Sequence, residues 1–131
     1  MDMEILLKDG KKVEAHYKGF TINTDQPEIT GGDNTAPTPF DLFIASIGTC
    51  VGIFTLSFCR QRSIETKDIK INLDIEKNEN KMIRNINIKI FLPKYFPEKY
   101  RTTIINVAEQ CSVKKHLDNP PSFNITSEYL K

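Results

Sequence analysis

The groups best suited to covalent chemistry in this chain of 131 residues are three cysteines, Cys50, Cys59 and Cys111. A thiolate is a strong nucleophile. In a reducing compartment, cysteines are more often reactive groups than members of structural disulfides. The three are an odd number and include no C-x-x-C pair, so the sequence predicts no disulfide framework. The two histidines, His16 and His116, have no paired-ligand spacing, and we expect neither a metal site nor a cofactor.

A long apolar helix is predicted to position Cys50. Thr38 has the side chain of an N-cap, Pro39 suits the first helical position, and Asp41 places a negative charge near the positive end of the helix dipole. The helix is expected to run to about residue 62. Cys59 follows Cys50 by nine residues, about 180° around the helix, so the two cannot form a disulfide within one chain. We expect Cys59 to be a buried bystander.

The same helix raises the question of a membrane. Eighteen residues, 42–59, carry no charge, which reaches the lower length of a membrane-spanning helix. Six of these eighteen are Ser, Thr or Gly, and a helix that is apolar all round is also typical of a buried core. We therefore expect a central core helix and no membrane. The lesser alternative is a membrane-associated chain that dimerises through Gly48-x-x-x-Gly52.

Charge and composition favour a soluble protein that does not bind nucleic acid. Lys and Arg total 18 against 17 for Asp and Glu, a formal charge of +1, which argues against electrostatic capture of nucleic acid or anionic lipid. With 39% hydrophobic and 27% charged residues, the chain has an ordinary globular composition. Its first residues contain no apolar run of signal-peptide length, and we expect a cytoplasmic protein.

The remaining pattern predicts a single α+β domain over residues 1–131, with antiparallel sheets around the central helix. Residues 2–24 alternate with period two and break at Asp9-Gly10 and Lys18-Gly19, which predicts a three-stranded meander. Two further alternating runs, 69–75 and 86–92, predict a hairpin. Pro97 begins a second helix whose apolar stripe includes Cys111 near its end. A helical turn over 113–117 and a final strand, Phe123–Ser127, are expected to follow.

Two stretches resemble the signatures of the OsmC/Ohr family. Residues 31–50, GGDNTAPTPFDLFIASIGTC, are similar to a loop of the type GG-x-N-x-x-P-x-P followed by a helix of the type E-L-x-x-A-x-x-x-C. Residues 108–117, AEQCSVKKHL, are similar to the family's second cysteine motif, A-x-x-C-P-V-x-K-x-L. The order of meander, long helix, hairpin, helix and strand also resembles the family's order, so the resemblance covers nearly the whole chain.

This resemblance implies an intertwined homodimer with two equivalent sites at the subunit interface, and a thiol peroxidase activity. Cys50 matches the attacking cysteine, which would reduce an organic hydroperoxide and become a sulfenic acid. Cys111 matches the resolving cysteine, and a small dithiol or lipoyl-type reductant would restore both thiols. The apolar residues that share the helical face of Cys50 or adjoin it would form a collar for an alkyl substrate: Phe43, Ile47 and Phe54.

Three departures from the family pattern bear on activity. Peroxidatic members use an N-terminal arginine beside the thiolate, partnered by a helix carboxylate, but this chain has no arginine before Arg60. Lys18 is our candidate for the missing cation. Asp41 replaces the glutamate at the helix start and is our candidate for the carboxylate. Ser112 stands where proline follows the second cysteine. Other candidate cations lie on the meander or beside the second cysteine: Lys8, Lys11, Lys12, His16, Lys114 and Lys115. The alternative function is a dimer that binds a small apolar or thiol-reactive ligand near Cys50 without turnover.

Overall fold

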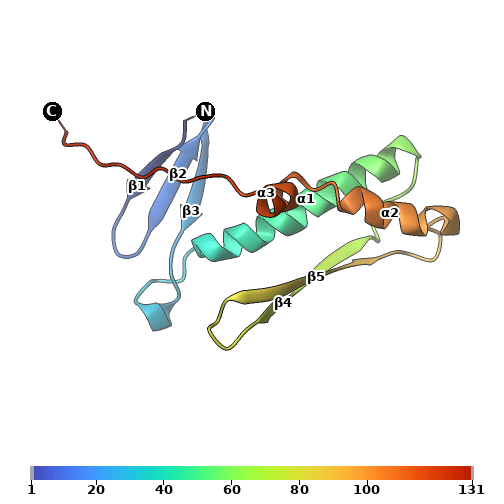
Figure 1. Cartoon of the computed structure of the whole chain (residues 1–131), viewed down its shortest axis with the longest axis horizontal. Coiled ribbons are helices and arrows are strands. Elements are labelled where there is room, and N and C mark those ends of the chain that lie inside the picture. Colours follow the sequence, from blue (N-terminus) through green and yellow to red (C-terminus); the bar gives the residue numbers. More distant parts are fainter. Residues whose placement is uncertain (1, 131) are drawn as a thin grey trace. The chain divides into compact units, whose positions relative to one another are not determined.

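The computed structural model describes residues 2–130 and divides into two compact units, one ending at Ser46 and the other beginning at Ile47. Figure 1 traces the elements in chain order: the three-stranded meander and the start of α1 belong to the first unit, and the β4–β5 hairpin and the C-terminal helices belong to the second. The chain is a mixed α+β fold with two small antiparallel sheets and one long apolar helix, as the sequence pattern predicts.

The first unit begins with the predicted meander. Strands β1 (Glu4–Leu7), β2 (Val13–Tyr17) and β3 (Phe20–Thr24) pair antiparallel in that order. The turn between β1 and β2 contains Gly10 at φ 64°, a left-handed conformation that glycine adopts at little cost. Because opposite residues in a register share a face, Ile5, Ala15 and Ile22 form one apolar row across the sheet.

A loop folded around one buried carboxylate leads from the meander to α1. Asp25 is fully buried and accepts hydrogen bonds from the Thr35 hydroxyl at 2.6 Å, the Thr35 N–H at 3.0 Å and the Gln26 N–H at 2.8 Å. These bonds, with those from Thr35 the strongest, hold the pKa of Asp25 well below its usual range. At Gly32 a Cβ atom would lie 2.0 Å from the Gln26 carbonyl oxygen, so only glycine allows this backbone approach.

Helix α1 (Pro39–Gln61) begins as the sequence predicts, with reciprocal capping. The Asp41 N–H donates to the Thr38 hydroxyl at 3.1 Å, and the Thr38 N–H donates to the Asp41 carboxylate at 3.0 Å. By length and composition α1 could cross a membrane, with a mean hydropathy of 2.0 over its most apolar 18-residue window, of which 28% is buried. The core helix of a soluble protein passes the same test, so this property alone decides nothing about a membrane.

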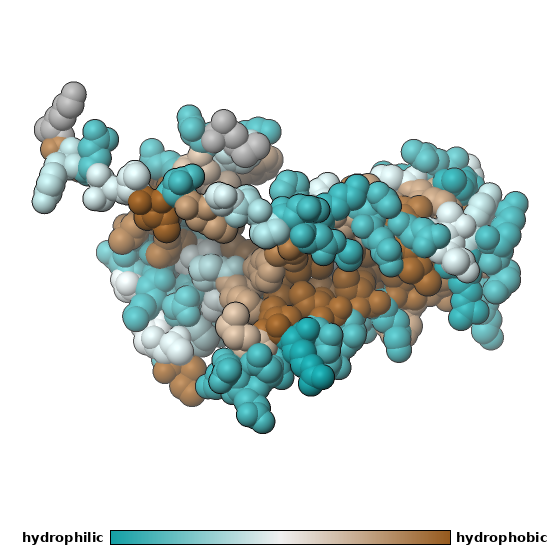
Figure 2. Space-filling view, in the orientation of Figure 1, coloured by the Kyte–Doolittle hydropathy of each residue, from teal (hydrophilic) through white to brown (hydrophobic). Residues whose placement is uncertain are grey.

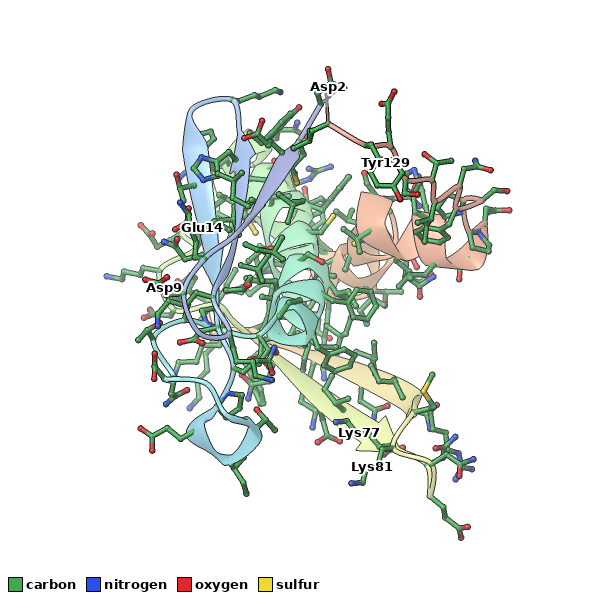
Figure 3. The ribbon with its side chains drawn as sticks, turned by 90° about the vertical axis from the view of Figure 1, so that its left-hand side faces the viewer. Asp2, Asp9, Glu14, Lys77, Lys81 and Tyr129 are labelled. Carbon is green, nitrogen blue, oxygen red and sulfur yellow. The ribbon has the colours of Figure 1, made fainter. Side chains whose placement is uncertain are left out.

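The second unit packs the C-terminal part of α1 against a hairpin. Strands β4 (Lys70–Lys77) and β5 (Ile83–Phe91) pair antiparallel, and Figure 3 shows Lys77 and Lys81 at the end of this hairpin. The strands alternate as predicted, and opposite pairs such as Leu73 and Ile88 share one face. Gly48 of α1 brings the helix close to this face, because a Cβ there would lie 3.1 Å from Leu73 Cδ1.

The C-terminal part differs from the prediction in two places. A 3₁₀ turn (η2, Glu98–Tyr100) leads into α2 (Arg101–Ala108), which ends before Cys111. The prediction that Cys111 lies on the stripe of this helix is therefore wrong. Cys111 has φ −47° and ψ 122°, an extended backbone, and is the N-cap of α3 (Ser112–Asp118). The predicted final strand is also wrong: residues 119–130 form no strand, because nothing in the described chain pairs with their backbone.

Candidate functional site

The second unit brings two of the three cysteines together. Val51, Ala108 and Cys111 form a buried apolar cluster, and Cys50 packs against it from α1 together with Val113 of α3. Cys111 is fully buried, whereas Cys50 is half-buried and reaches the surface. The fold thus places one accessible thiol beside one inaccessible thiol.

Three groups beside Cys50 favour its thiolate form: the backbone N–H groups of Val113 and Ser112 and the Cys111 thiol. Burial is the largest single influence and raises the pKa of Cys50, because it disfavours the charged thiolate. The three donors together outweigh burial and lower the pKa of Cys50 below its ordinary value of 9.0. Hydrogen bonds to the charged form are the physical reason, since each donor stabilises the thiolate.

Cys111 has the opposite character. Burial first, and then its hydrogen bond to Cys50, raises the pKa of the Cys111 thiol. Its sulfur also caps α3, accepting a hydrogen bond from the Lys114 backbone N–H at 3.4 Å. The pair is therefore asymmetric: Cys50 is the thiol that ionises more readily and is reachable from solvent, and Cys111 is the protonated neighbour.

Cys59 lies in a separate apolar cluster with Phe58, Phe96 and Ile104. Its side chain is fully buried. Burial raises the pKa of the Cys59 thiol, and the charge of Arg62 only partly opposes that effect. Arg62 is itself engaged, with its guanidinium 3.8 Å from the centre of the Phe58 ring. The net effect of this environment disfavours a thiolate at Cys59.

Two of the predicted collar residues, Ile47 and Phe54, lie in the second unit and line different hollows there. Ile47 lines a groove of about 420 Å³ in the second unit, whereas Phe54 lines a different hollow beside Phe58. Phe43 lies in the first unit, where its ring centre is 5.9 Å from that of Phe40. A common collar around Cys50 therefore stays a prediction.

The two proposed supporting residues also lie in the first unit. The Asp41 carboxylate is occupied with helix capping. The Lys18 ammonium lies 5.0 Å from the centre of the Tyr17 ring. Neither placement tests a role beside Cys50, and both roles stay predictions.

Sequence reasoning did not predict that the Ser112 and Val113 backbone N–H groups lower the pKa of Cys50. Side-chain chemistry gives no sign of such donors. The one available signal was the serine in place of proline after Cys111, because proline has no N–H to donate. Within residues 2–130, no three His, Cys, Asp or Glu side chains are grouped so that they could hold a metal ion.

Comparison with known proteins defines the class. The family model described as "OsmC-like protein" matches residues 31–126, which include Cys50, Cys111 and the loop that precedes α1. The chain therefore belongs to the OsmC-like family. None of the curated proteins matches the sequence.

Solved structures agree with this fold. An OsmC-like protein from Mycoplasma pneumoniae has a TM-score of 0.71 at 17% identity, with 91% of this chain and 87% of that chain covered. A hypothetical protein from Aquifex aeolicus VF5 has a TM-score of 0.71 at 23% identity, with coverage of 91% and 87%. An organic hydroperoxide resistance protein from Legionella pneumophila has a TM-score of 0.55 at 15% identity, with coverage of 89% of both chains. At these identities the likeness shows the fold.

Proposed function

We propose that this protein is a thiol peroxidase that reduces organic hydroperoxides through Cys50 and Cys111. The observation that carries the proposal is the asymmetry of the sulfur pair: a half-buried thiol with a lowered pKa packs against a cluster that contains a fully buried one. Members of the same family named as organic hydroperoxide resistance proteins share the fold. A pair of this kind suits an accessible nucleophile with a resolving thiol behind it.

The chemistry follows from the two environments. The Cys50 thiolate attacks the distal oxygen of ROOH, the O–O bond breaks, and the alkoxide takes up a proton to leave as ROH, so that Cys50 becomes a sulfenic acid. The Cys111 sulfur then displaces the hydroxyl of this sulfenic acid, water leaves, and a Cys50–Cys111 disulfide forms. A small dithiol reduces the disulfide by two successive exchanges and is itself oxidised to a disulfide.

Peptide mapping tests the pairing directly. Reduced protein treated with one equivalent of an organic hydroperoxide is expected to yield mainly the Cys50–Cys111 disulfide, because Cys50 packs against the cluster that contains Cys111. Cys59 is expected to remain a thiol, since it lies in another cluster. A dominant bridge that contains Cys59, or the absence of any bridge, would overturn the assignment.

The second candidate is a binding protein without turnover. The observation that favours it is the groove of about 420 Å³, which is lined by apolar side chains of α1, β5 and α2 together with four charged residues, Lys89, Arg101, Glu109 and Lys114. Figure 2 shows apolar surface over this part of the molecule, with hydrophilic residues along its borders. This volume is in the range of small-ligand pockets. Consumption of several equivalents of hydroperoxide in the presence of a dithiol would exclude this candidate, and consumption of at most one would favour it.

We also propose that the protein is a cytoplasmic homodimer. Several large apolar side chains of the meander are exposed, including Leu7 at 83% and Phe20 at 70%. A sheet face of this kind is normally covered by another layer. Light scattering at micromolar concentration is therefore expected to give twice the chain mass of 15.0 kDa, without detergent. A folded 15.0 kDa monomer, or solubility only in detergent, would contradict this prediction.

A further inference from the structure

Helix α3 begins at an atom that the proposed chemistry also uses, the Cys111 sulfur. That sulfur is the N-cap of the helix and accepts a hydrogen bond from the Lys114 backbone N–H at 3.4 Å. An N-cap side chain satisfies one of the N–H groups that have no partner within the first turn of a helix. A reaction that repositions the Cys111 sulfur therefore changes how α3 begins.

The other support for α3 is weak. The helix has seven residues, Ser112–Asp118, and none of them is buried. Val113 packs against the buried cluster that contains Cys111. The ion pair between Lys114 and Asp118, at 3.2 Å, is exposed and contributes little to stability. Because a helix of this length is marginal by itself, its start depends strongly on the cap.

A disulfide between Cys50 and Cys111 would use the same sulfur. Cys50 packs from α1 against the cluster that contains Cys111. In the proposed reaction the two thiols give two electrons and two protons to ROOH, which leaves as ROH and water, and one S–S bond forms. A disulfide has a specific sulfur–sulfur distance and dihedral angle. Cys50, and no longer the Lys114 N–H, then determines where the Cys111 sulfur lies.

We propose that the Cys111 sulfur is a redox switch for α3: it caps the helix in the reduced protein and releases it when the Cys50–Cys111 disulfide forms. This proposal rests on the proposed function, because the disulfide is a product of that chemistry. Since Val113 holds α3 against the cluster that contains Cys111, release of the helix opens the disulfide to the dithiol that reduces it. Oxidation of the sulfur pair is thereby linked to access by its reductant.

The experiment compares hydrogen exchange of the Lys114 backbone N–H, followed by NMR, in the reduced and the oxidised protein. One equivalent of cumene hydroperoxide oxidises the protein, and peptide mass identifies the bridge. The Lys114 N–H is expected to exchange about three- to tenfold faster after oxidation, as for the loss of an N-cap. Cys50→Ser, treated in the same way, cannot form the bridge and is expected to keep slow exchange. Equal exchange in the two forms of the wild type would overturn the proposal.

Two variants test the cap without any oxidant. Cys111→Ala has no capping atom, whereas Cys111→Ser keeps a side-chain oxygen that can accept the hydrogen bond from Lys114. The Lys114 N–H is expected to exchange as fast in Cys111→Ala as in the oxidised wild type, and as slowly in Cys111→Ser as in the reduced wild type. Equal exchange in the two variants would show that the Cys111 side chain does not hold α3, and would contradict the switch.

Diamide separates this proposal from the proposed function, because it oxidises two thiols to a disulfide without a peroxide. If hydroperoxide does not react but the diamide-oxidised protein releases α3, the switch is supported and the peroxidase function is contradicted. If hydroperoxide is consumed but α3 stays capped in the disulfide form, the switch alone is contradicted. If neither oxidant joins Cys50 to Cys111, both proposals are wrong.

Discussion

Replacing Cys50 by serine is expected to reduce hydroperoxide consumption more than a hundredfold, because a serine hydroxyl does not ionise near pH 7 and cannot supply the attacking sulfur. The measurement is loss of cumene hydroperoxide in the presence of a dithiol. Cys59→Ser is the matched control, since it also removes one thiol from α1. That variant is expected to keep full activity per folded molecule, because Cys59 is buried in a separate cluster.

The Cys111→Ser variant separates the two steps. Serine is a good N-cap, so α3 retains its start. This variant is expected to react once with hydroperoxide and to stop as a Cys50 sulfenic acid, which a dimedone-type trap detects by mass. Equal activity of the Cys50→Ser protein and the wild type would contradict the assignment of the nucleophile.

Patterns within single elements were predictable from sequence because the causes are local. The meander follows from period-two alternation with glycine in the turns, and β1, β2 and β3 lie within the predicted range 2–24. Capping chemistry at Thr38 and Asp41 fixed the start of α1. Each of these signals comes from residues a few positions apart, where propensity and hydrogen bonding act without help from the rest of the fold.

The environment of the sulfur pair was only partly predictable. A resemblance of two motifs paired Cys50 with Cys111, but the apolar periodicity after Pro97 placed Cys111 on α2. The structure ends that helix at Ala108 and uses the Cys111 sulfur as the cap of α3. The prediction that Cys111 lies on the apolar stripe of the second helix was wrong because a buried cysteine fits an apolar stripe and an N-cap position equally well. Two of the three groups that lower the pKa of Cys50 are backbone N–H groups, for which residue types carry no signal.

The predicted strand Phe123–Ser127 failed for a different reason. Its alternation is real, but a strand exists only when a second backbone accepts and donates the ladder bonds. Phe123 and Ile125 are 84% and 93% exposed, and residues 119–130 form no strand. Sequence periodicity shows only that one segment can form a strand. Whether a partner strand pairs with it depends on the rest of the fold or on an assembly.

Replacing Asp25 by asparagine is expected to destabilise the loop before α1 and to lower the thermal midpoint by about 5–10 °C at pH 7. The carboxylate accepts three hydrogen bonds, two of them from Thr35. An asparagine amide would place an N–H₂ group against one of these donors and leave it unpaired. Thermal unfolding followed by circular dichroism gives the midpoint, and hydrogen exchange of the Thr35 amide gives the local effect.

The pH dependence of the thermal midpoint shows whether the ionised carboxylate of Asp25 is what stabilises the loop. The folded-state pKa of Asp25 lies below its ordinary value of 3.8, so its contribution to stability is complete above that value and is lost as the pH falls toward the folded-state pKa. The difference in midpoint between wild type and Asp25→Asn is therefore expected to be constant from pH 7 to about pH 5 and to shrink below about pH 4.

Thr35→Val is the matched variant, because it removes the 2.6 Å hydroxyl donor and keeps the backbone N–H. It is expected to show a smaller loss with the same acid dependence. A difference that stays constant down to pH 2 would mean that packing, and not the ionised carboxylate, holds the loop.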